Sequence, residues 1–209
     1  MNFYDRFILP PLTHYACGTP LLARHRAALI PAARGQVLEI GIGSALNLDY
    51  YDAASVSSLT GIDPSQQLLA YAAKRIKRVA FPVNLIPASA ESLPVPDDTV
   101  DTIVVTFSLC TIPDVAAALA EMRRVLKPGG RLLFCEHGLA PDASVLRWQQ
   151  RLDPLWGKIA GGCHLTRNIP QLLSEANFRF AELQSAYLPH APRFAGYLYR
   201  GSAKINPGA

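Results

Sequence analysis

The sequence predicts an α/β domain with a mostly parallel sheet and helices on both of its faces. Short apolar runs that are typical of buried strands alternate with helix-length segments along the chain. The 209 residues are half hydrophobic and 17% charged, which suits one domain with a well-buried core and excludes a mostly disordered chain. No run approaches the roughly 18 consecutive apolar residues that a membrane-spanning helix needs.

Strands and helices follow one another in a regular order up to about residue 136. Five strands are expected, at residues 36–40, 57–62, 83–87, 100–107 and 130–135. Helices are expected at 64–79 and 113–126, where apolar residues recur at helical spacing. The run Lys127-Pro128-Gly129-Gly130 is typical of a helix end followed by a turn.

The two ends of the chain depart from this alternation. Residues 1–35 precede the first strand and are expected to form a helical lid or arm over the ligand crevice, with the main domain at 36–209. Residues 138–167 are expected to be an insertion above the sheet on the acceptor side. A helix at 170–176 and a hairpin of strands at 178–187 and 194–199 would close the chain.

Charge and cysteine usage narrow the partners and the compartment. Lys and Arg exceed Asp and Glu by 20 − 16 = 4, and this mild excess does not favour a nucleic-acid partner. It leaves weak contact with an anionic membrane surface open. Asp5 and Arg6 interrupt any secretory signal. The four cysteines are widely spaced without a C-x-x-C pair, so we expect reduced thiols, no metal site and a cytoplasmic protein.

A glycine-rich turn follows the first predicted strand. Gly41-x-Gly43 ends that strand, and Asp63 ends the next one, 20 residues after Gly43. Glycines let the backbone approach a ligand closely, and a carboxylate at this distance accepts hydrogen bonds from both ribose hydroxyls. The pattern predicts a nucleoside site.

Two positions distinguish between the common nucleoside cofactors. A dinucleotide fingerprint needs a third glycine at position 46, where this chain has Leu46. Glu39, two residues before Gly41, would repel a pyrophosphate but suits the amino group of S-adenosylmethionine. The residues therefore favour S-adenosylmethionine over NAD.

Residues 36–136 resemble the class I methyltransferases. Glu39-x-Gly41-x-Gly43 is similar to their first motif, Asp63-Pro64-Ser65 to their ribose-binding loop and residues 88–94 to their adenine-binding loop. The resemblance implies a Rossmann-like, seven-stranded sheet with an antiparallel last strand. It also implies these cofactor contacts: Glu39, Gly41, Gly43, Asp63, Pro64, Ser89, Ala90 and Ser108. Ser89 departs from the pattern, because that position usually carries an acidic residue.

Several segments after residue 107 resemble a narrower group, the animal alkyl-thiol methyltransferases. The similar segments are 108–110, 136–137, 148–150, 153–156 and 162–167. The resemblance implies a small, largely apolar thiol acceptor. The acceptor candidates are His137 and His164 as groups that take the proton, and Trp148, Cys163 and Arg167 as lining. The animal proteins carry a membrane-anchoring N-terminal helix, which is not expected here.

Alternatives stay open for the reaction and for single residues. The acceptor is otherwise a lipid-headgroup amine or a quinone precursor, or the chain binds S-adenosylmethionine without catalysis. His137 is equally well explained by a structural hydrogen bond, and Trp148 by simple packing. Arg167 is explained by an ion pair near a helix start, and Cys163 needs no role as a nucleophile because methyl transfer forms no enzyme-bound intermediate.

Overall fold

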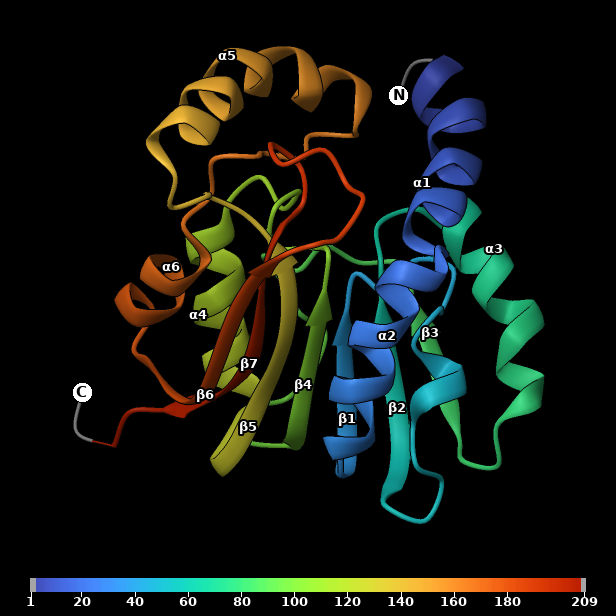
Figure 1. Ribbon diagram of the computed structural model, residues 1–209. Helices are drawn as coiled ribbons and strands as arrows, with labels where there is room; N and C mark the ends of the chain where they lie inside the picture. The colour runs from blue at the N-terminus through green and yellow to red at the C-terminus, as the bar shows by residue number, and fades with distance from the viewer. Residues whose placement is uncertain (1–2, 208–209) are drawn as a thin grey trace.

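The protein folds around a seven-stranded sheet with the strand order β3-β2-β1-β4-β5-β7-β6 (Figure 1). The computed structural model describes residues 3–207. Residues 1–2 of the predicted arm and residues 208–209 of the predicted domain lie outside the described residues. Strands β1 to β5 pair in parallel, and β7 pairs antiparallel with both β5 and β6. The predicted fold class, with its antiparallel last strand, is confirmed.

The strands and helices follow one another along the chain in the predicted order. The strands are β1 (Gly35–Ile40), β2 (Val56–Ile62), β3 (Val83–Ile86), β4 (Val100–Thr106), β5 (Leu126–His137), β6 (Phe178–Tyr187) and β7 (Tyr197–Ile205). The α-helices are α1 (Leu9–Cys17), α2 (Pro20–Leu29), α3 (Gln66–Arg75), α4 (Val115–Val125), α5 (Ala143–Ile159) and α6 (Ile169–Glu175). A π-helix, η1 (Tyr4–Ile8), precedes α1. The last strand was predicted at 194–199, but it begins at Tyr197 and continues to Ile205.

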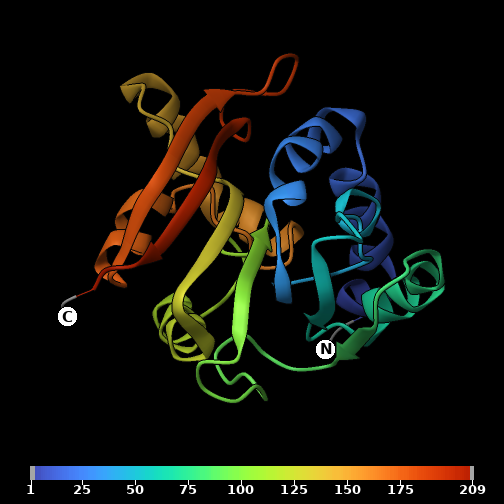
Figure 2. The same ribbon diagram turned by 90° about the horizontal axis from the view of Figure 1, so that it is seen from below.

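Both faces of the sheet are buried, and the side chains of successive strand residues point to opposite faces. Ile103 and Val105 pack with α4 and α6 in one core, whereas Val104 belongs to a second core with α2 and α3. Figure 2 shows α4 on one side of the strands and the N-terminal helices on the other. Because side chains alternate along a strand and both faces are covered, the middle of β4, residues 103–105, is apolar at every position rather than at every second one.

The turn predicted at residues 127–130 lies inside β5 instead of before it. Leu126 pairs with Val100, but the next pair joins Arg131 to Thr102, so β5 carries extra residues against β4. Gly129 has φ +81°, which glycine adopts without strain. Proline and glycine here mark a bulge in a long strand, and such a bulge has the same residue signature as a turn.

The carboxyl ends of the parallel strands are covered by segments from both ends of the sequence. Helix α5 lies across this edge of the sheet, at the top of Figure 1, and η1 and α1 stand beside it. The hydroxyl of Tyr4 donates a hydrogen bond to the carbonyl of Ile159, 2.5 Å away, which links the N-terminal arm to the end of α5. Within residues 3–207, no helix is long and apolar enough to span a membrane.

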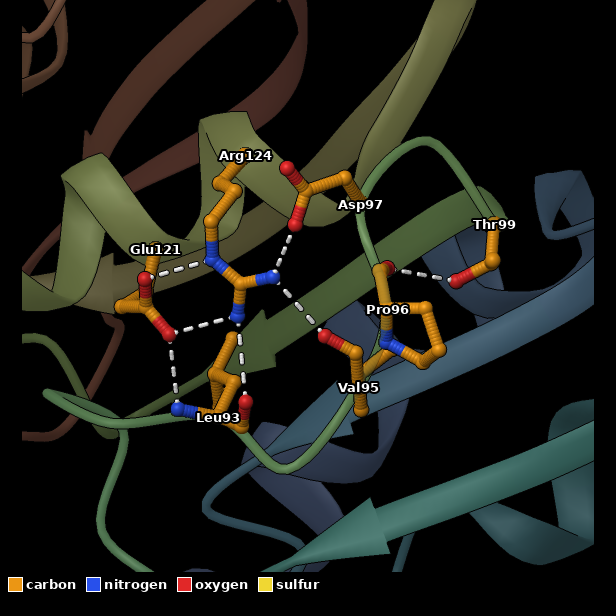
Figure 3. Close-up of polar contacts among 7 residues, drawn as sticks. All are labelled: Leu93, Val95, Pro96, Asp97, Thr99, Glu121 and Arg124. Carbon is orange, nitrogen blue, oxygen red and sulfur yellow. Dashed lines mark hydrogen bonds and ion pairs between the residues drawn. The ribbon is translucent and has the colours of Figure 1, made fainter.

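One arginine ties the segment before β4 to α4 (Figure 3). Arg124 donates to both carboxylate oxygens of Glu121 at 2.7 Å, and to the carbonyls of Val95 at 2.9 Å and Leu93 at 3.0 Å. The hydrogen bonds from Arg124 to Glu121 lower the pKa of Glu121 to about 2. Asp97 also pairs with Arg124, but its side chain is 71% exposed, so water screens that pair.

We predict that Arg124→Met lowers the free energy of unfolding by about 1–3 kcal/mol, because two carbonyls and a carboxylate lose a charged donor. Urea denaturation would measure the change. Arg78→Met is the matched control, since Arg78 is exposed and should change stability by less than about 0.5 kcal/mol. Equal stability of the two variants would contradict the role given to Arg124.

Candidate functional site

A cavity of about 470 Å³ opens at the carboxyl ends of β1, β2 and β4. The order of the strands reverses between β1 and β4, and ligands of open α/β sheets bind at such a switch point. All eight residues predicted to contact the cofactor line this one cavity: Glu39, Gly41, Gly43, Asp63, Pro64, Ser89, Ala90 and Ser108.

The loop after β1 needs its two glycines for different reasons. Gly41 has φ +66°, and a Cβ there would collide with the side chain of Ser108. Gly43 has φ +53°, and a Cβ there would meet its neighbours only at an ordinary contact distance of 3.9 Å, so backbone conformation rather than crowding favours glycine. The loop therefore presents bare backbone to the cavity.

Asp63 holds the glycine loop against the end of β2. Its two carboxylate oxygens accept from the backbone N–H of Gly43 at 2.9 Å and of Ser65 at 2.8 Å. Burial raises the pKa of Asp63, and these two N–H donors oppose that rise. Each oxygen keeps a second lone pair, so the carboxylate can still accept hydrogen bonds from two hydroxyl groups of a ligand.

Glu39 is a buried carboxylate in the cavity wall, only 1% exposed. It accepts hydrogen bonds from the amide of Asn47 at 2.9 Å and from the hydroxyl of Tyr51 at 2.7 Å. Burial raises its pKa to about 7, although both hydrogen bonds and the charge of Arg26 lower it. A cationic ligand group beside Glu39 would stabilise the ionised form further.

Arg26 brings a buried positive charge to the same cavity from α2. It is 4% exposed, donates to the carbonyl of Cys17 at 2.8 Å and lies over the ring of Phe107. Its Nε has no hydrogen-bond partner among residues 3–207. A buried guanidinium with a free donor needs an anionic or carbonyl partner. Arg26 and Glu39 together fit the carboxylate and ammonium groups of an amino acid, such as the methionine part of S-adenosylmethionine.

The N-terminal helices and the end of α5 form the remaining wall. Leu9 of α1 packs against Gly161, and Gly162 lies next to Thr111 of the loop after β4. His14 of α1 also lines the cavity, with its Nδ1 2.7 Å from the hydroxyl of Ser44. Most of this wall is apolar, including Pro10, Ile112, Pro113 and Ala160.

None of the five acceptor candidates lines this cavity. His137 and Cys163 contact each other, with the imidazole Nε2 2.8 Å from the sulfur. His164 pairs with Asp153 at 3.0 Å, and Trp148 is 57% exposed. Arg167 donates to the backbone carbonyl of Leu109 rather than to a carboxylate.

His14 and Arg26 are cavity residues that the sequence motifs did not reveal. Both precede the first strand and belong to no short motif with the glycine turn. The sequence predicts that residues 1–35 cover the crevice. That expectation identified the segment that carries His14 and Arg26, but not these two side chains.

Comparison with known proteins agrees with this geometry. Residues 38–134 match a family model described as a methyltransferase domain. The chain is 30% identical to the rat thiol S-methyltransferase TMT1B over 77% of this chain and 68% of that protein. The chain belongs to the class I S-adenosylmethionine-dependent methyltransferases. It is therefore a methyltransferase, and its cofactor is S-adenosylmethionine.

Two further comparisons show how widely this fold is shared. Phosphatidylethanolamine N-methyltransferase of Cereibacter sphaeroides is 35% identical over 54% of this chain and 56% of that protein. The putative methyltransferase solved in complex with Trm112 from Haloferax volcanii superposes with a TM-score of 0.69, covering 97% of this chain and 96% of that one. At 19% sequence identity, that likeness concerns the fold alone.

We predict that Asp63→Ala weakens S-adenosylmethionine binding at least about tenfold, because each charge-assisted hydrogen bond contributes roughly 1.5–3 kcal/mol. Calorimetry on the purified protein would measure the affinity. Glu182→Ala serves as the control, since Glu182 is exposed on β6, away from the cavity. Unchanged affinity in Asp63→Ala would remove the carboxylate from the cofactor site.

The raised pKa of Glu39 predicts that cofactor affinity depends on pH. The pKa of Glu39 is about 7, so its carboxyl is protonated in the free protein when the pH is below that value. A cationic ligand must then displace the proton to bind. The dissociation constant should rise as pH falls below about 7, approaching tenfold per pH unit. Calorimetry in buffers of different ionisation enthalpy should also register proton release.

Glu39→Gln is the matched variant, because it keeps the size of the side chain and removes the titration. We expect it to bind S-adenosylmethionine more weakly, with an affinity that is flat between about pH 5.5 and 7. A wild-type affinity that is also flat over this range would contradict contact between Glu39 and the ligand ammonium.

Proposed function

We propose that the protein methylates a small, largely apolar thiol by direct in-line displacement. The observation that carries this proposal is the make-up of the cavity, where charged groups for a cofactor adjoin an apolar wall built by Leu9, Ile112 and Ala160. The likeness to a relative named as a thiol S-methyltransferase, across three quarters of the chain, supports the thiol.

The proposed cofactor contacts follow from the charges that line the cavity. Glu39 binds the ammonium and Arg26 the carboxylate of the methionine part, and Asp63 beside Pro64 binds the ribose. Ser89 and Ala90 border the adenine, and Gly41, Gly43 and Ser108 provide the close backbone approach. When bound, the cofactor supplies a methyl group activated by a sulfonium.

Thiol chemistry suits a cavity of this kind. A thiol as acidic as that of cysteine has a pKa near 8.5, so forming its thiolate at pH 7 costs only about 2 kcal/mol. His14 is the imidazole that lines the cavity, and we assign it the proton in place of His137 and His164, which the sequence favoured. The apolar wall excludes water and holds the acceptor sulfur in line for transfer.

We further propose that residues 1–35 form an arm over the site and that residues 138–167 shape its acceptor side. The hydrogen bond from Tyr4 to Ile159 and the packing of Leu9 against Gly161 support this division. The four cysteines form no disulfide in the described residues, which fits a reducing compartment such as the cytoplasm.

A lipid-headgroup amine is the second candidate acceptor. Large apolar side chains are exposed on the two elements that flank the cavity, among them Phe7 and Leu12 of the arm and Trp148 and Leu155 of α5. These would contact a lipid surface, and the Cereibacter relative is named for phosphatidylethanolamine. An ammonium acceptor must lose its proton near pH 10, however, which costs about 4 kcal/mol at pH 7.

The deciding experiment measures S-adenosylhomocysteine formation with three acceptors: a simple alkyl thiol, phosphatidylethanolamine vesicles and a demethylated quinone. We expect turnover with the thiol and little with the other two. Turnover with vesicles or quinone but not with thiol would replace the proposed substrate class. No turnover with any of them, together with tight cofactor binding, would favour a protein that only binds S-adenosylmethionine.

We predict that His14→Ala lowers kcat for the thiol by about 10²–10⁴ at pH 7, the range expected for loss of general-base catalysis. The loss should shrink at high pH, where the thiol ionises unaided. His190→Ala is the matched control, because His190 is exposed in the loop between β6 and β7. If His137→Ala or His164→Ala lowers kcat and His14→Ala does not, the original assignment from sequence stands.

A further inference from the structure

Three side chains with metal-binding atoms meet beside the cavity without lining it. They are Cys110 in the turn after β4, His137 at the end of β5 and Cys163 just after α5, here called the Cys-His-Cys cluster. Their two sulfurs and one ring nitrogen all lie within 4.8 Å of one another. Cys110 is 2% and Cys163 8% exposed, so the cluster is largely shielded from water.

The backbone holds the two cysteine-bearing segments in place independently of the thiols. The N–H of His164 donates to the carbonyl of Cys110 at 2.9 Å. Gly161 and Gly162 have φ +63° and +86°, a pair of left-handed residues that turns the chain sharply after α5 and brings Cys163 back to the sheet. The three donor atoms therefore converge on a rigid framework, as a metal site requires.

The donor set indicates which ion would bind. Two thiols and an imidazole are the ligands that Zn²⁺ prefers, and they disfavour Mg²⁺ and Ca²⁺, which take oxygen. No further histidine, cysteine or carboxylate joins the group among residues 3–207. Three protein ligands leave a fourth tetrahedral position for water or another exogenous ligand.

We propose that Cys110, His137 and Cys163 are the ligands of a zinc ion. On binding, both thiols release their protons, so two S–H bonds are exchanged for two Zn–S bonds and the imidazole binds through its neutral Nε2. The ion joins the end of β4, the end of β5 and the segment after α5. It thereby fixes Thr111 and Gly161, which lie next to the cluster in sequence and line the cavity.

This site revises the expectation of no metal that cysteine spacing gave. The ligands are 27 and 26 residues apart in sequence, a separation that no short motif records. They meet because neighbouring strands β4 and β5 end at the same edge of the sheet and α5 returns across that edge.

The test uses the full chain, stripped with a chelator, reduced and titrated with Co²⁺ as a spectroscopic probe. We expect one Co²⁺ per chain, with thiolate-to-cobalt charge-transfer absorption and tetrahedral d–d bands that Zn²⁺ abolishes. Cys110→Ser, Cys163→Ser and His137→Gln should each weaken Zn²⁺ binding at least about a hundredfold, because loss of an outer-shell partner alone costs ten- to a hundredfold.

Cys135→Ala is the matched control. Cys135 is a fully buried thiol on β5 outside the cluster, so this variant should bind Co²⁺ as the wild type does. Zn²⁺ should raise the melting temperature of the stripped wild type and of Cys135→Ala, but not of the ligand variants. The wild-type measurement decides the question even if a ligand variant fails to fold.

Three results would overturn the proposal. The first is the absence of thiolate-to-cobalt absorption in the wild type. The second is unchanged Co²⁺ binding in Cys110→Ser and Cys163→Ser. The third is a Cys110–Cys163 disulfide, detected by mass spectrometry, that survives treatment with a reductant and prevents metal binding.

Discussion

The buried charge of Glu39 constrains the structure around the cavity more than any other group. A carboxylate that is 1% exposed at the end of a central strand has to be satisfied by the protein. Asn47 and Tyr51 do this from the segment after the glycine loop, and Asn47 also donates to Thr106 of β4. One carboxylate thus fixes the path of residues 41–51 and ties the ends of β1 and β4 together.

The fold, and the gathering at one cavity of the residues expected to contact the cofactor, could be predicted because their signals are local. Apolar residues recur in each parallel strand, and Asp114 caps α4 by accepting from the N–H of Ala117, three residues ahead. Glu39, Gly41, Gly43 and Asp63 lie on two consecutive strand ends, and neighbouring parallel strands place those ends together. A sequence separation of 20 residues therefore converts directly into contact, as the hydrogen bond from Gly43 to Asp63 records.

The rest of the cavity lining could not be predicted because its contacts join distant segments. His14 reaches Ser44 across 30 residues, and Tyr4 reaches Ile159 across 155. Arg26 reaches the cavity because α2 packs on the sheet through Leu29 and the Ile30 that follows it. No residue spacing in the sequence indicates this tertiary contact. His137 was expected just after the fifth strand and is the last residue of β5, yet its ring contacts Cys163 rather than the cavity. Position along a strand predicts the edge that a residue reaches, but not the direction of its side chain once an insertion covers that edge.

The family match covers only part of the cavity lining. The methyltransferase domain model covers residues 38–134, whereas His14, Arg26, Ala160 and Gly161 all lie outside it. The two N-terminal helices also differ in burial. Arg26 and Leu29 of α2 are buried, but Leu12 and Tyr15 of α1 are 51% and 77% exposed. Elements with few buried contacts open at the lowest free-energy cost, so the packing around these residues holds α1 less tightly than α2. The cavity lining thus combines residues of the shared domain with residues of the N-terminal helices and of the segment after α5, which lie outside the family match.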